Sequence, residues 1–445
     1  MKINMETETQ DYIDNYYART LPEDKPYPAL EGTIETDVCV IGGGMAGLAV
    51  ALGLVERGKK VVLLEGRRLG WGASGRNGGF CMAGYALGNE DAKTLARKVG
   101  LPRARELFQL TRDAQSLIRG RIAKYKIPCD VVDGQVIASW HENSDEQKRV
   151  IDYMAKNFDI HYEFWPRKKV RELYSTDRYY DATFLPGNFH MHPLRYIHGI
   201  AAEITRTGGE IFEKTAAVKL DKSSDTKIVY TDRGQVKAQH VVFCGSAYFL
   251  PALDWRLKQS CLPVSTYVMV TEVLSKQKME SAIRAPYAIH DTRFAYDYYR
   301  PTADNRLLWG GRVAYNKTPS QLANIMHKDM AKIYPQLADV KAEMSWTGLM
   351  GYTVHKMPHI GKFADGLWYC TNFGGNGVGP TTAGGEAIAS AIAQGDETYK
   401  MYEPFGFEYT GGALGPYVAR AVYYGWEISD KILDWKSERA RKKAA

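Results

Sequence analysis

The first strongly patterned part of the chain alternates between apolar runs and a cluster of glycines. Residues 38–41 form an apolar run, glycines follow at 42, 43, 44 and 47, and a stretch compatible with a helix continues to about Arg57. A second apolar run over residues 61–64 ends in Glu65. This order of short apolar runs around a helical stretch predicts a strand, a tight glycine turn, a helix and a second strand.

This unit has the residues that an adenine dinucleotide needs at the end of a strand. Gly42 permits a tight turn, Gly44 lets the backbone approach a pyrophosphate, and Gly47 lets helix and strand pack closely. The helix N-terminus offers unpaired N–H groups and the positive end of its dipole to phosphates. Glu65 is placed to accept hydrogen bonds from a ribose diol. The expected contacts are Gly42, Gly43, Gly44, Met45, Ala46, Gly47, Glu65, Gly66 and Arg67.

The chain continues in a way that distinguishes between dinucleotides. Residues 70–79 contain five glycines in ten positions, and such a segment can lie flat along an extended ligand and point N–H groups at it. A flexible surface loop is the alternative. A nicotinamide enzyme would be expected to continue promptly into a third strand. The segment therefore favours FAD, along which it would extend from the pyrophosphate to the flavin ring. The expected contacts are Gly72, Ala73, Ser74, Arg76, Asn77, Gly78 and Gly79.

Two later strand ends repeat the pattern of an apolar run that stops at glycine. One ends at Cys244 and Gly245, and the other, residues 367–372, runs into a glycine turn and a helix over residues 383–394. A helix N-terminus there would stabilise partial negative charge, such as the O2/N1 edge of a reduced flavin. The further expected FAD contacts are Val218, Cys244, Gly245, Gly374, Asn376, Gly377, Val378 and Gly379.

The rest of the pattern predicts an α/β protein with a second sheet. Residues 131–140 suggest a strand pair turning near Asp133 and Gly134, and residues 196–208 an amphipathic helix. Alternating, tyrosine-rich strands are expected over residues 263–273, 294–300 and 306–312. Alternation indicates a sheet with one covered and one open face. This sheet would cover the nucleotide-binding unit.

Composition and charge exclude several classes of protein. The 445 residues suggest two or three compact units, and no apolar run reaches the length of a membrane span. The first residues lack the apolar segment of a secretion signal, so a cytoplasmic location is expected. Six scattered cysteines support neither a disulfide framework nor a zinc site, and no metal is expected. The net charge of +7 is diluted, so nucleic-acid binding is not expected.

The C-terminal part combines aromatic residues at near-helical spacing with a basic tail. Tyr423, Trp426 and Trp435 fall in the aromatic stretch, and residues 436–443 carry the cations. This helical extension could dock on the body of the protein, form a dimer contact, or lie at a membrane interface, in that order.

Several motifs together resemble one known family. The GxGxxG unit is followed by GWGASGRNGG, GNFHMHPLRY, DYYRPTADNRLLWGGR, WTG with KMPHIG, and GGNGVG with AGG. They occur, over roughly residues 34–395, in the order of the D-amino-acid oxidase and glycine oxidase superfamily. The resemblance implies oxidation of a C–N bond of an amine or amino acid by hydride transfer to flavin N5, giving an imine that hydrolyses.

The resemblance also implies a domain plan. A Rossmann-like FAD-binding domain would be assembled from residues 34–89, 184–255 and 350–395. A substrate domain with a mainly antiparallel or mixed sheet would comprise residues 90–183 and 256–349. Residues 1–33 would form an N-terminal extension and residues 396–445 a C-terminal helical one.

Three positions depart from the family pattern. Asn376 stands where many relatives have histidine, and it cannot titrate. No cysteine lies between Thr347 and Pro358, where sarcosine-oxidase relatives attach the flavin, so noncovalent FAD is expected. Leu308 takes the place of a lysine that assists oxygen in those oxidases, so the electron acceptor, oxygen or another, stays open.

Aromatic side chains are the main candidates for the substrate pocket, because they hold an amine's carbon chain and tolerate its cationic form. They are Tyr298, Tyr299, Trp346 and Tyr352, each with an ordinary core position as the alternative. Tyr298 and Tyr299 face opposite sides of a strand, and we assign Tyr298 to the flavin side together with Arg300.

Two polar residues complete the candidate pocket. Arg300 could clamp a substrate carboxylate or form a structural ion pair, and His355 could be a local base or a structural histidine. His190 and His192 share a strand face but lack a third metal ligand. Two other classes stay open: a flavoprotein that serves electron transfer or assembly with little amine oxidation of its own, and a nicotinamide dehydrogenase.

Overall fold

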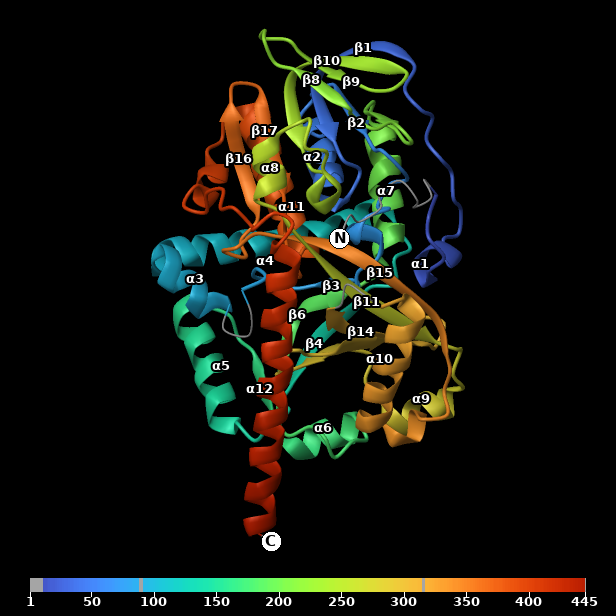
Figure 1. Ribbon diagram of the computed structural model, residues 1–445, viewed down its shortest axis with the longest axis vertical. Helices are drawn as coiled ribbons and strands as arrows, with labels where there is room; N and C mark the ends of the chain where they lie inside the picture. The colour runs from blue at the N-terminus through green and yellow to red at the C-terminus, as the bar shows by residue number, and fades with distance from the viewer. Residues whose placement is uncertain (1–10, 88–90, 314–316, 445) are drawn as a thin grey trace.

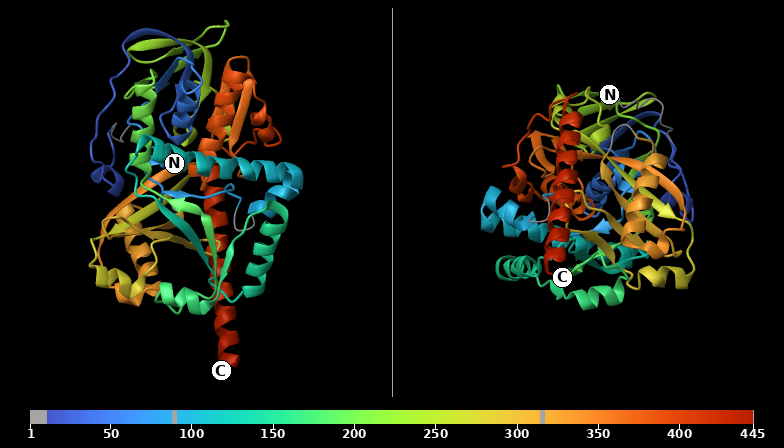
Figure 2. Two further views of the ribbon diagram at one scale, coloured as in Figure 1. Left: turned by 180° about the vertical axis from the view of Figure 1, so that it is seen from behind. Right: turned by 60° about the horizontal axis from the view of Figure 1, so that its bottom comes forward.

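The computed structural model describes residues 11–87, 91–313 and 317–444 and contains two sheets. Figure 1 shows the first sheet in the upper part of the molecule and the second in the lower part, with the long helix α4 (Leu101–Tyr125) crossing between them. The reverse view in Figure 2 shows the same two tiers. The predicted α/β class with an additional, mixed sheet is confirmed.

The first sheet is built on five parallel strands. Its central strand β1 (Gly32–Ile41) pairs in parallel with β10 (Gly234–Phe243) and β2 (Val61–Leu64). β17 (Leu367–Thr371) and β7 (Glu210–Phe212) extend it in parallel. Its antiparallel strands are β16 (His359–Ala364), β8 (Lys219–Asp221) and β9 (Lys227–Tyr230). This arrangement places the carboxyl ends of β1, β10 and β17 side by side.

The parallel strands are buried on both faces because their apolar residues are nearly continuous. Val38 and Val40 pack with α2 (Met45–Val55), α7 (Pro193–Arg206) and α11 (Val378–Gln394). Cys39 and Ile41 pack on the opposite face, against residues of β9, β10 and the segment that follows β10. The glycine turn after β1 is therefore supported by packed structure on both sides.

The second sheet is antiparallel except for one parallel pair, β4 with β12. Helices α6 (Arg167–Leu173), α9 (Lys276–Ala282) and α10 (Pro319–Ile333) cover its lower face. Its strands in spatial order are β15 (Ala342–Tyr352), β11 (Leu262–Thr271), β14 (Leu307–Val313), β13 (Tyr298–Pro301), β12 (Ala288–Asp291), β4 (Val132–Ala138), β6 (Ala182–His190) and β3 (Phe80–Cys81), with β5 (Glu163–Trp165) on β6.

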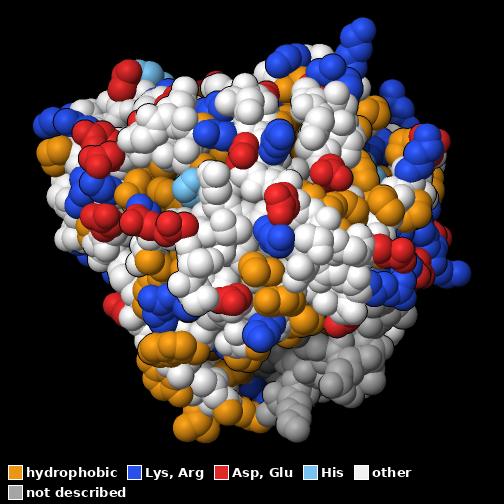
Figure 3. All heavy atoms as spheres, turned by 90° about the horizontal axis from the view of Figure 1, so that it is seen from above, with side chains coloured by type: hydrophobic (Ala, Val, Ile, Leu, Met, Phe, Trp, Pro, Cys, Tyr) orange, Lys and Arg blue, Asp and Glu red, His pale blue; other side chains and the backbone are white. Residues whose placement is uncertain are grey.

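Shorter helices and a long C-terminal helix complete the structure. They are α1 (Tyr16–Arg19), α3 (Asp91–Val99), α5 (Ser144–Phe158), α8 (Trp255–Gln259) and α12 (Gly415–Ala444). α12 crosses one side of the molecule and extends beyond the lower sheet (Figures 1 and 2). Figure 3, seen from above, shows Lys and Arg interspersed with Asp and Glu, so the positive charge forms no single patch on that face.

Some boundaries differ from the sequence-based expectation. The expected boundaries at 183/184 and 349/350 fall inside β6 and β15, both of which belong to the second sheet. Alternation identifies a strand but does not say which sheet it joins, and this accounts for the difference. The strand pair expected to turn near Asp133 and Gly134 is instead one strand, β4, with a register shift at Gly134, whose φ is +98°.

Candidate functional site

The glycine turn after β1 is closed by the neighbouring strand. Gly42 has φ +113°, and a Cβ there would come within 2.9 Å of the Cys244 carbonyl carbon and oxygen. A Cβ on Gly47 would meet the Gly42 carbonyl oxygen at 1.9 Å. Both positions therefore require glycine. The Cys244 N–H donates to the Ile41 carbonyl at 2.8 Å, so the ends of β1 and β10 form one unit.

The ends of β10 and β17 carry two non-glycine residues in the left-handed region. They are Ser246, with φ +49°, and Asn372, with φ +61°. The Ser246 N–H donates to Thr371 Oγ1 at 2.9 Å and joins the two strand ends. A Cβ on Gly351 of β15 would meet both Ser246 Oγ and Asn372 Oδ1. Strained backbone of this kind concentrates at functional sites, and here it lies at the carboxyl edge where α/β sheets bind ligands.

Glu65 follows β2 beside the same turn. Its carboxylate accepts the Gly43 N–H at 2.7 Å and the Arg67 N–H at 2.9 Å. Burial raises its pKa, and these two backbone donors oppose that shift. Each carboxylate oxygen has a second lone pair, which leaves acceptor capacity for a ribose diol. Thr215 N–H donates to the Glu65 carbonyl at 2.8 Å, so the segment leading to Val218 lies alongside.

The glycine segment 70–79 runs from the N-terminus of α2 to the second sheet. Ser74 Oγ accepts the Met45 N–H at 3.0 Å. At the other end Trp346 Nε1 donates to the Arg76 carbonyl at 2.8 Å, and Arg76 donates to the Thr347 carbonyl at 3.2 Å. The Asn77 amide donates to the carbonyls of Ala73 and Ser74 and accepts the Gly79 N–H, which folds the segment upon itself.

A second glycine turn leads into α11. Gly374 has φ +64°, and the N-cap residue Gly377 provides no side-chain cap for the first N–H groups of this helix. The Asn376 amide nitrogen donates to the Gly84 carbonyl at 3.0 Å, whereas its buried Oδ1 has no partner among the described residues. An uncapped N-terminus of a long helix and an unpaired buried oxygen mark a place where a polar ligand edge fits.

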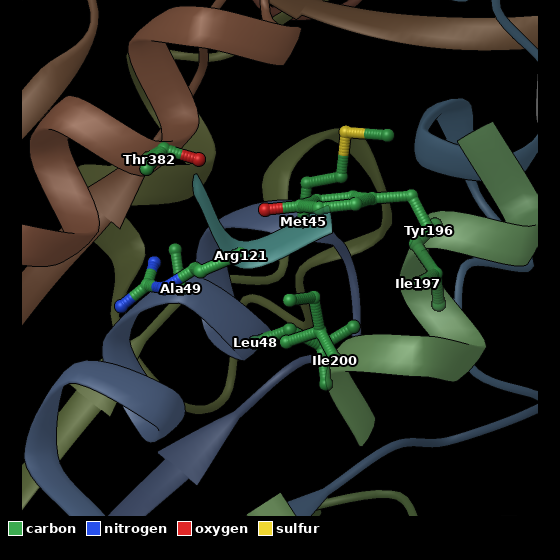
Figure 4. Close-up of a pocket in the computed structure, with 8 residues that line it drawn as sticks. All are labelled: Met45, Leu48, Ala49, Arg121, Tyr196, Ile197, Ile200 and Thr382. Carbon is green, nitrogen blue, oxygen red and sulfur yellow. The ribbon is translucent and has the colours of Figure 1, made fainter. Parts of the chain in front are cut away.

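Figure 4 shows a small cavity behind the first turn, lined by α2, α4, α7 and α11. Met45 is among the lining residues, and Tyr196 directs its hydroxyl across the cavity toward Thr382. Met45 contacts Ser74 of the glycine segment through its backbone N–H.

Tyr298 and Tyr352 pack directly on the glycine turns. A Cβ on Gly78 or Gly310 would come within 2.7 Å or 2.1 Å of the Tyr298 ring. A Cβ on Gly374 would come within 2.8 Å of the Tyr352 ring. Both tyrosines keep part of their side chains exposed, and burial raises both pKa values, so both hydroxyls stay protonated. Tyr299 faces the lower core and stacks on Trp309, as alternation predicts.

Trp346 and Arg300 are buried and bind backbone carbonyls, so neither side chain is open to a substrate. Trp346 is 2% exposed and binds the Arg76 carbonyl. Arg300 is 4% exposed and donates to the carbonyls of Gly78, at 2.7 Å, and Met191, at 3.2 Å. No acidic residue in the described parts of the chain pairs with Arg300. In place of the expected carboxylate clamp or ion pair, the donors of Arg300 are directed to the carbonyls of Gly78 and Met191 and to the Tyr17 hydroxyl.

His355 is a structural histidine in this structure. Its Nδ1 accepts the Met357 N–H at 3.1 Å, so Nε2 carries the proton and donates to the Gly406 carbonyl at 3.1 Å. Burial lowers its pKa. Both ring nitrogens are engaged away from the glycine turns, which favours the structural alternative over the local base.

His190 and His192 also have structural partners. His192 Nδ1 accepts the Arg195 N–H at 3.1 Å and so caps α7, and His190 Nε2 lies 3.0 Å from the Pro286 carbonyl. No group of three potential metal ligands occurs in the described residues. Cys81 lies beside the N-terminus of α11, but burial raises the pKa of its thiol and leaves it unreactive.

An N-terminal segment, residues 11–31, holds the glycine segment from outside, and sequence reasoning did not find it. Tyr12 donates to the Leu69 carbonyl at 2.8 Å, and Trp71 Nε1 donates to the Asp11 carbonyl at 2.9 Å. Tyr17 is completely buried, and its hydroxyl donates to the Asn77 carbonyl at 2.7 Å and accepts from Arg300 at 3.3 Å. The run of tyrosines in this segment was the available signal.

Comparisons with known proteins agree with this geometry. The family "DAO: FAD dependent oxidoreductase" matches residues 37–391. "Gamma-glutamylputrescine oxidoreductase" of Escherichia coli (strain K12) is 32% identical over 430 residues, covering 95% of this chain and 99% of that protein. "Probable oxidoreductase OrdL" of Haemophilus influenzae (strain ATCC 51907 / DSM 11121 / KW20 / Rd) is 32% identical over 399 residues, covering 88% and 91%.

Among solved structures, glycine oxidase from Bacillus cereus ATCC 14579 superposes with a TM-score of 0.68 at 22% identity, covering 82% of this chain and 97% of that one. L-proline dehydrogenase from P. horikoshii has a TM-score of 0.69 at 18% identity, covering 84% and 96%. These two likenesses concern the fold.

The chain therefore belongs to the DAO family of FAD-dependent oxidoreductases. It is an enzyme, and its cofactor is FAD. The residues fit this cofactor: a Cβ at Gly42 or Gly47 would clash with neighbouring backbone, so glycine keeps the turn tight, and the buried Asn376 Oδ1 has no partner among the described residues beside the uncapped α11. The expectation of FAD from the glycine segments is confirmed. No helix in the described part of the chain has the length and apolar character needed to cross a membrane.

Proposed function

We propose that the protein oxidises a C–N bond of a small amine or amino acid, with a gamma-glutamylated or secondary amine as the leading candidate. Support comes from the similarity to proteins that include gamma-glutamylputrescine oxidoreductase and glycine oxidase. When bound, FAD supplies the hydride acceptor at its N5 atom. The product is an imine, which water hydrolyses to a carbonyl compound and an amine or ammonia.

The single observation that carries the proposal is the placement of Tyr298 and Tyr352. These two partly exposed aromatic side chains come from different strands and pack on Gly78 and on Gly374–Gly375, which belong to the two predicted flavin-contacting segments. Aromatic faces on such a surface can hold an amine's carbon chain and orient its α-carbon. Trp346 and Arg300 act as positioning residues that keep the glycine segment in place for them.

The candidate residues offer no base that titrates near neutral pH. Burial keeps the pKa values of Tyr298 and Tyr352 above their ordinary value, and His355 has both nitrogens engaged elsewhere. An apolar, partly buried pocket disfavours a charged amine. We therefore infer that the substrate reacts as the neutral amine and that the pH dependence of kcat/KM follows the substrate's own pKa.

Two finer points belong to the same proposal. Residues 347–358 contain no cysteine, which supports noncovalent FAD. Leu308 is completely buried in an apolar cluster, so that position brings no ammonium group to the site. This supports an electron acceptor that does not depend on such a lysine, whether oxygen or another compound.

The test is an anaerobic screen of the purified, yellow protein. Polyamines, gamma-glutamylated amines, N-methyl amino acids and D-amino acids are added in turn, and the loss of flavin absorbance is followed. At least one class should bleach the flavin within seconds to minutes. Failure of the whole panel would favour a flavoprotein that serves electron transfer or assembly. Rapid reoxidation on admitting air would identify oxygen as the acceptor.

A further inference from the structure

The C-terminal helix α12 is attached to the body of the protein by its acidic residues. Glu427 pairs with Arg312 at 2.7 Å. The Asp430 carboxylate accepts the backbone N–H groups of Phe294 and Ala295 at 3.1 Å and 3.0 Å. Glu427, Asp430 and the next acidic residue, Asp434, lie on one face of the helix, because spacings of three and four residues bring side chains to the same side.

The same face continues one turn further. Asp434 accepts a hydrogen bond from Trp140 Nε1 at 2.7 Å and pairs with Arg178 at 2.9 Å. Tyr423, one turn before Glu427, is 7% exposed. The inner face of α12 thus attaches to the body through three carboxylates, Glu427, Asp430 and Asp434, the reverse of an ordinary surface helix.

The outward face of α12 is apolar. Val418, Val422, Ile428 and Ile432 are 62%, 48%, 57% and 48% exposed, and Trp435 is 55% exposed. A face this apolar over several turns is unusual for a surface helix. The helix runs along one side of the molecule (Figures 1 and 2), and the exposed fractions of these side chains make the apolar face accessible from outside.

Charge distinguishes between the possible occupants of this face. Every carboxylate among the described side chains of α12 binds the body, as the three acidic residues above show. The exposed charges toward its C-terminal end are the cations Lys431 and Lys436, and the sequence continues with Arg439, Arg441, Lys442 and Lys443 against one Glu438. A second copy of the chain would bring an equally basic helix end and, among the described side chains of α12, no outward carboxylate to pair with it.

We propose that the outward face of α12 binds the surface of an anionic lipid membrane. The exposed aliphatic and tryptophan side chains enter the boundary between headgroups and acyl chains, while the net positive charge at the C-terminal end of the helix attracts anionic headgroups. Residues 415–434 form about 30 Å of helix at 1.5 Å per residue, long enough to lie in the membrane plane. Because the acidic face is fixed to the protein, the body is held against the membrane in one orientation.

The test uses the full-length, FAD-loaded protein and sedimentation with vesicles. Phosphatidylcholine vesicles with and without phosphatidylglycerol are compared at low and high salt. We expect binding only with phosphatidylglycerol, weakened at high salt by screening. The Ile428→Asp variant should lose at least about tenfold in partition coefficient. Val273→Asp is the matched control, because Val273 is 57% exposed but lies between β11 and α9.

Further measurements keep the test decisive. Flavin absorbance and melting temperature show that the variants are folded, and brominated lipids should quench fluorescence in the wild-type protein but less in Trp435→Phe. Equal vesicle binding by Ile428→Asp and the wild type would overturn the proposal. So would a concentration-dependent dimer in light scattering that Ile428→Asp abolishes while anionic vesicles fail to bind.

Discussion

Replacing Arg300 by lysine tests whether this side chain holds the glycine segment or binds substrate. The guanidinium donates to the Gly78 and Met191 carbonyls and to the Tyr17 hydroxyl. A lysine keeps the charge but cannot span these oxygens with a planar fork. Two lost bonds from a charged donor, at about 1.5–3 kcal/mol each, correspond to about 3–6 kcal/mol before relaxation. If 1.4 kcal/mol of this falls on the FAD site, affinity for FAD drops about tenfold.

The assay has two parts. FAD binding to apoprotein is titrated by fluorescence, and kcat/KM is measured with saturating FAD for amines with and without a carboxylate. We expect weaker FAD binding and an equal loss of kcat/KM for both classes. Arg284→Lys is the control, because Arg284 binds one carbonyl, that of Glu172, on the exposed surface. Normal FAD affinity with a raised KM only for carboxylate-bearing amines would refute the positioning role and restore the clamp.

Three further substitutions address other parts of the structure. Tyr17→Phe removes a buried hydroxyl that bonds twice, at about 1–3 kcal/mol, and should speed FAD release about tenfold in stopped-flow measurements; an unchanged rate contradicts this. Gly374→Ala strains a left-handed residue against the Tyr352 ring, whereas Gly395→Ala has φ +75° and open space. Only the first should alter the flavin absorbance spectrum, and identical spectra would count against the assigned turn. Burial lowers the pKa of His192 to about 2, below the 6.5 of an ordinary histidine. Its stabilisation is therefore present above pH 6.5 and is lost as pH falls, by about 1.4 kcal/mol per unit. His192→Asn keeps a capping acceptor, so its melting temperature should fall less steeply than the wild type's between pH 6.5 and about pH 5; parallel curves would exclude this histidine as a source of acid sensitivity.

The fold was largely predictable because its signals are local. The turn after β1 needs glycine at Gly42 and Gly47 for steric reasons that are written in the sequence. The alternation of Tyr298 and Tyr299 likewise predicts rings on opposite sides of the strand, and the two rings do have different neighbours, Phe80 and Trp309. Sheet membership was less accessible: β6 pairs with β3, β4 and β5, contacts that no periodicity records.

The candidate site was only partly predictable, because side-chain partners come from distant parts of the chain. From the sequence, Arg300 was a candidate for binding a ligand carboxylate, yet the oxygens that accept its hydrogen bonds belong to Gly78, Met191 and Tyr17. A sequence gives the donor and not the acceptors. For His355 the sequence left a base and a structural role open, and the contact of its second nitrogen with the Gly406 carbonyl, from a distant part of the chain, favours the structural role.

The joining of three strand ends at one edge of the sheet, where we propose that FAD binds, has a consequence for synthesis of the protein. The first turn follows β1, its cover at Cys244–Gly245 follows β10, and the last turn follows β17, immediately before α11. A nascent chain therefore exposes its fingerprint glycines long before the segments that complete the site leave the ribosome. FAD loading must wait until nearly the whole family domain has emerged. Limited flavin supply in an expression host should accordingly yield colourless full-length protein rather than truncated chains.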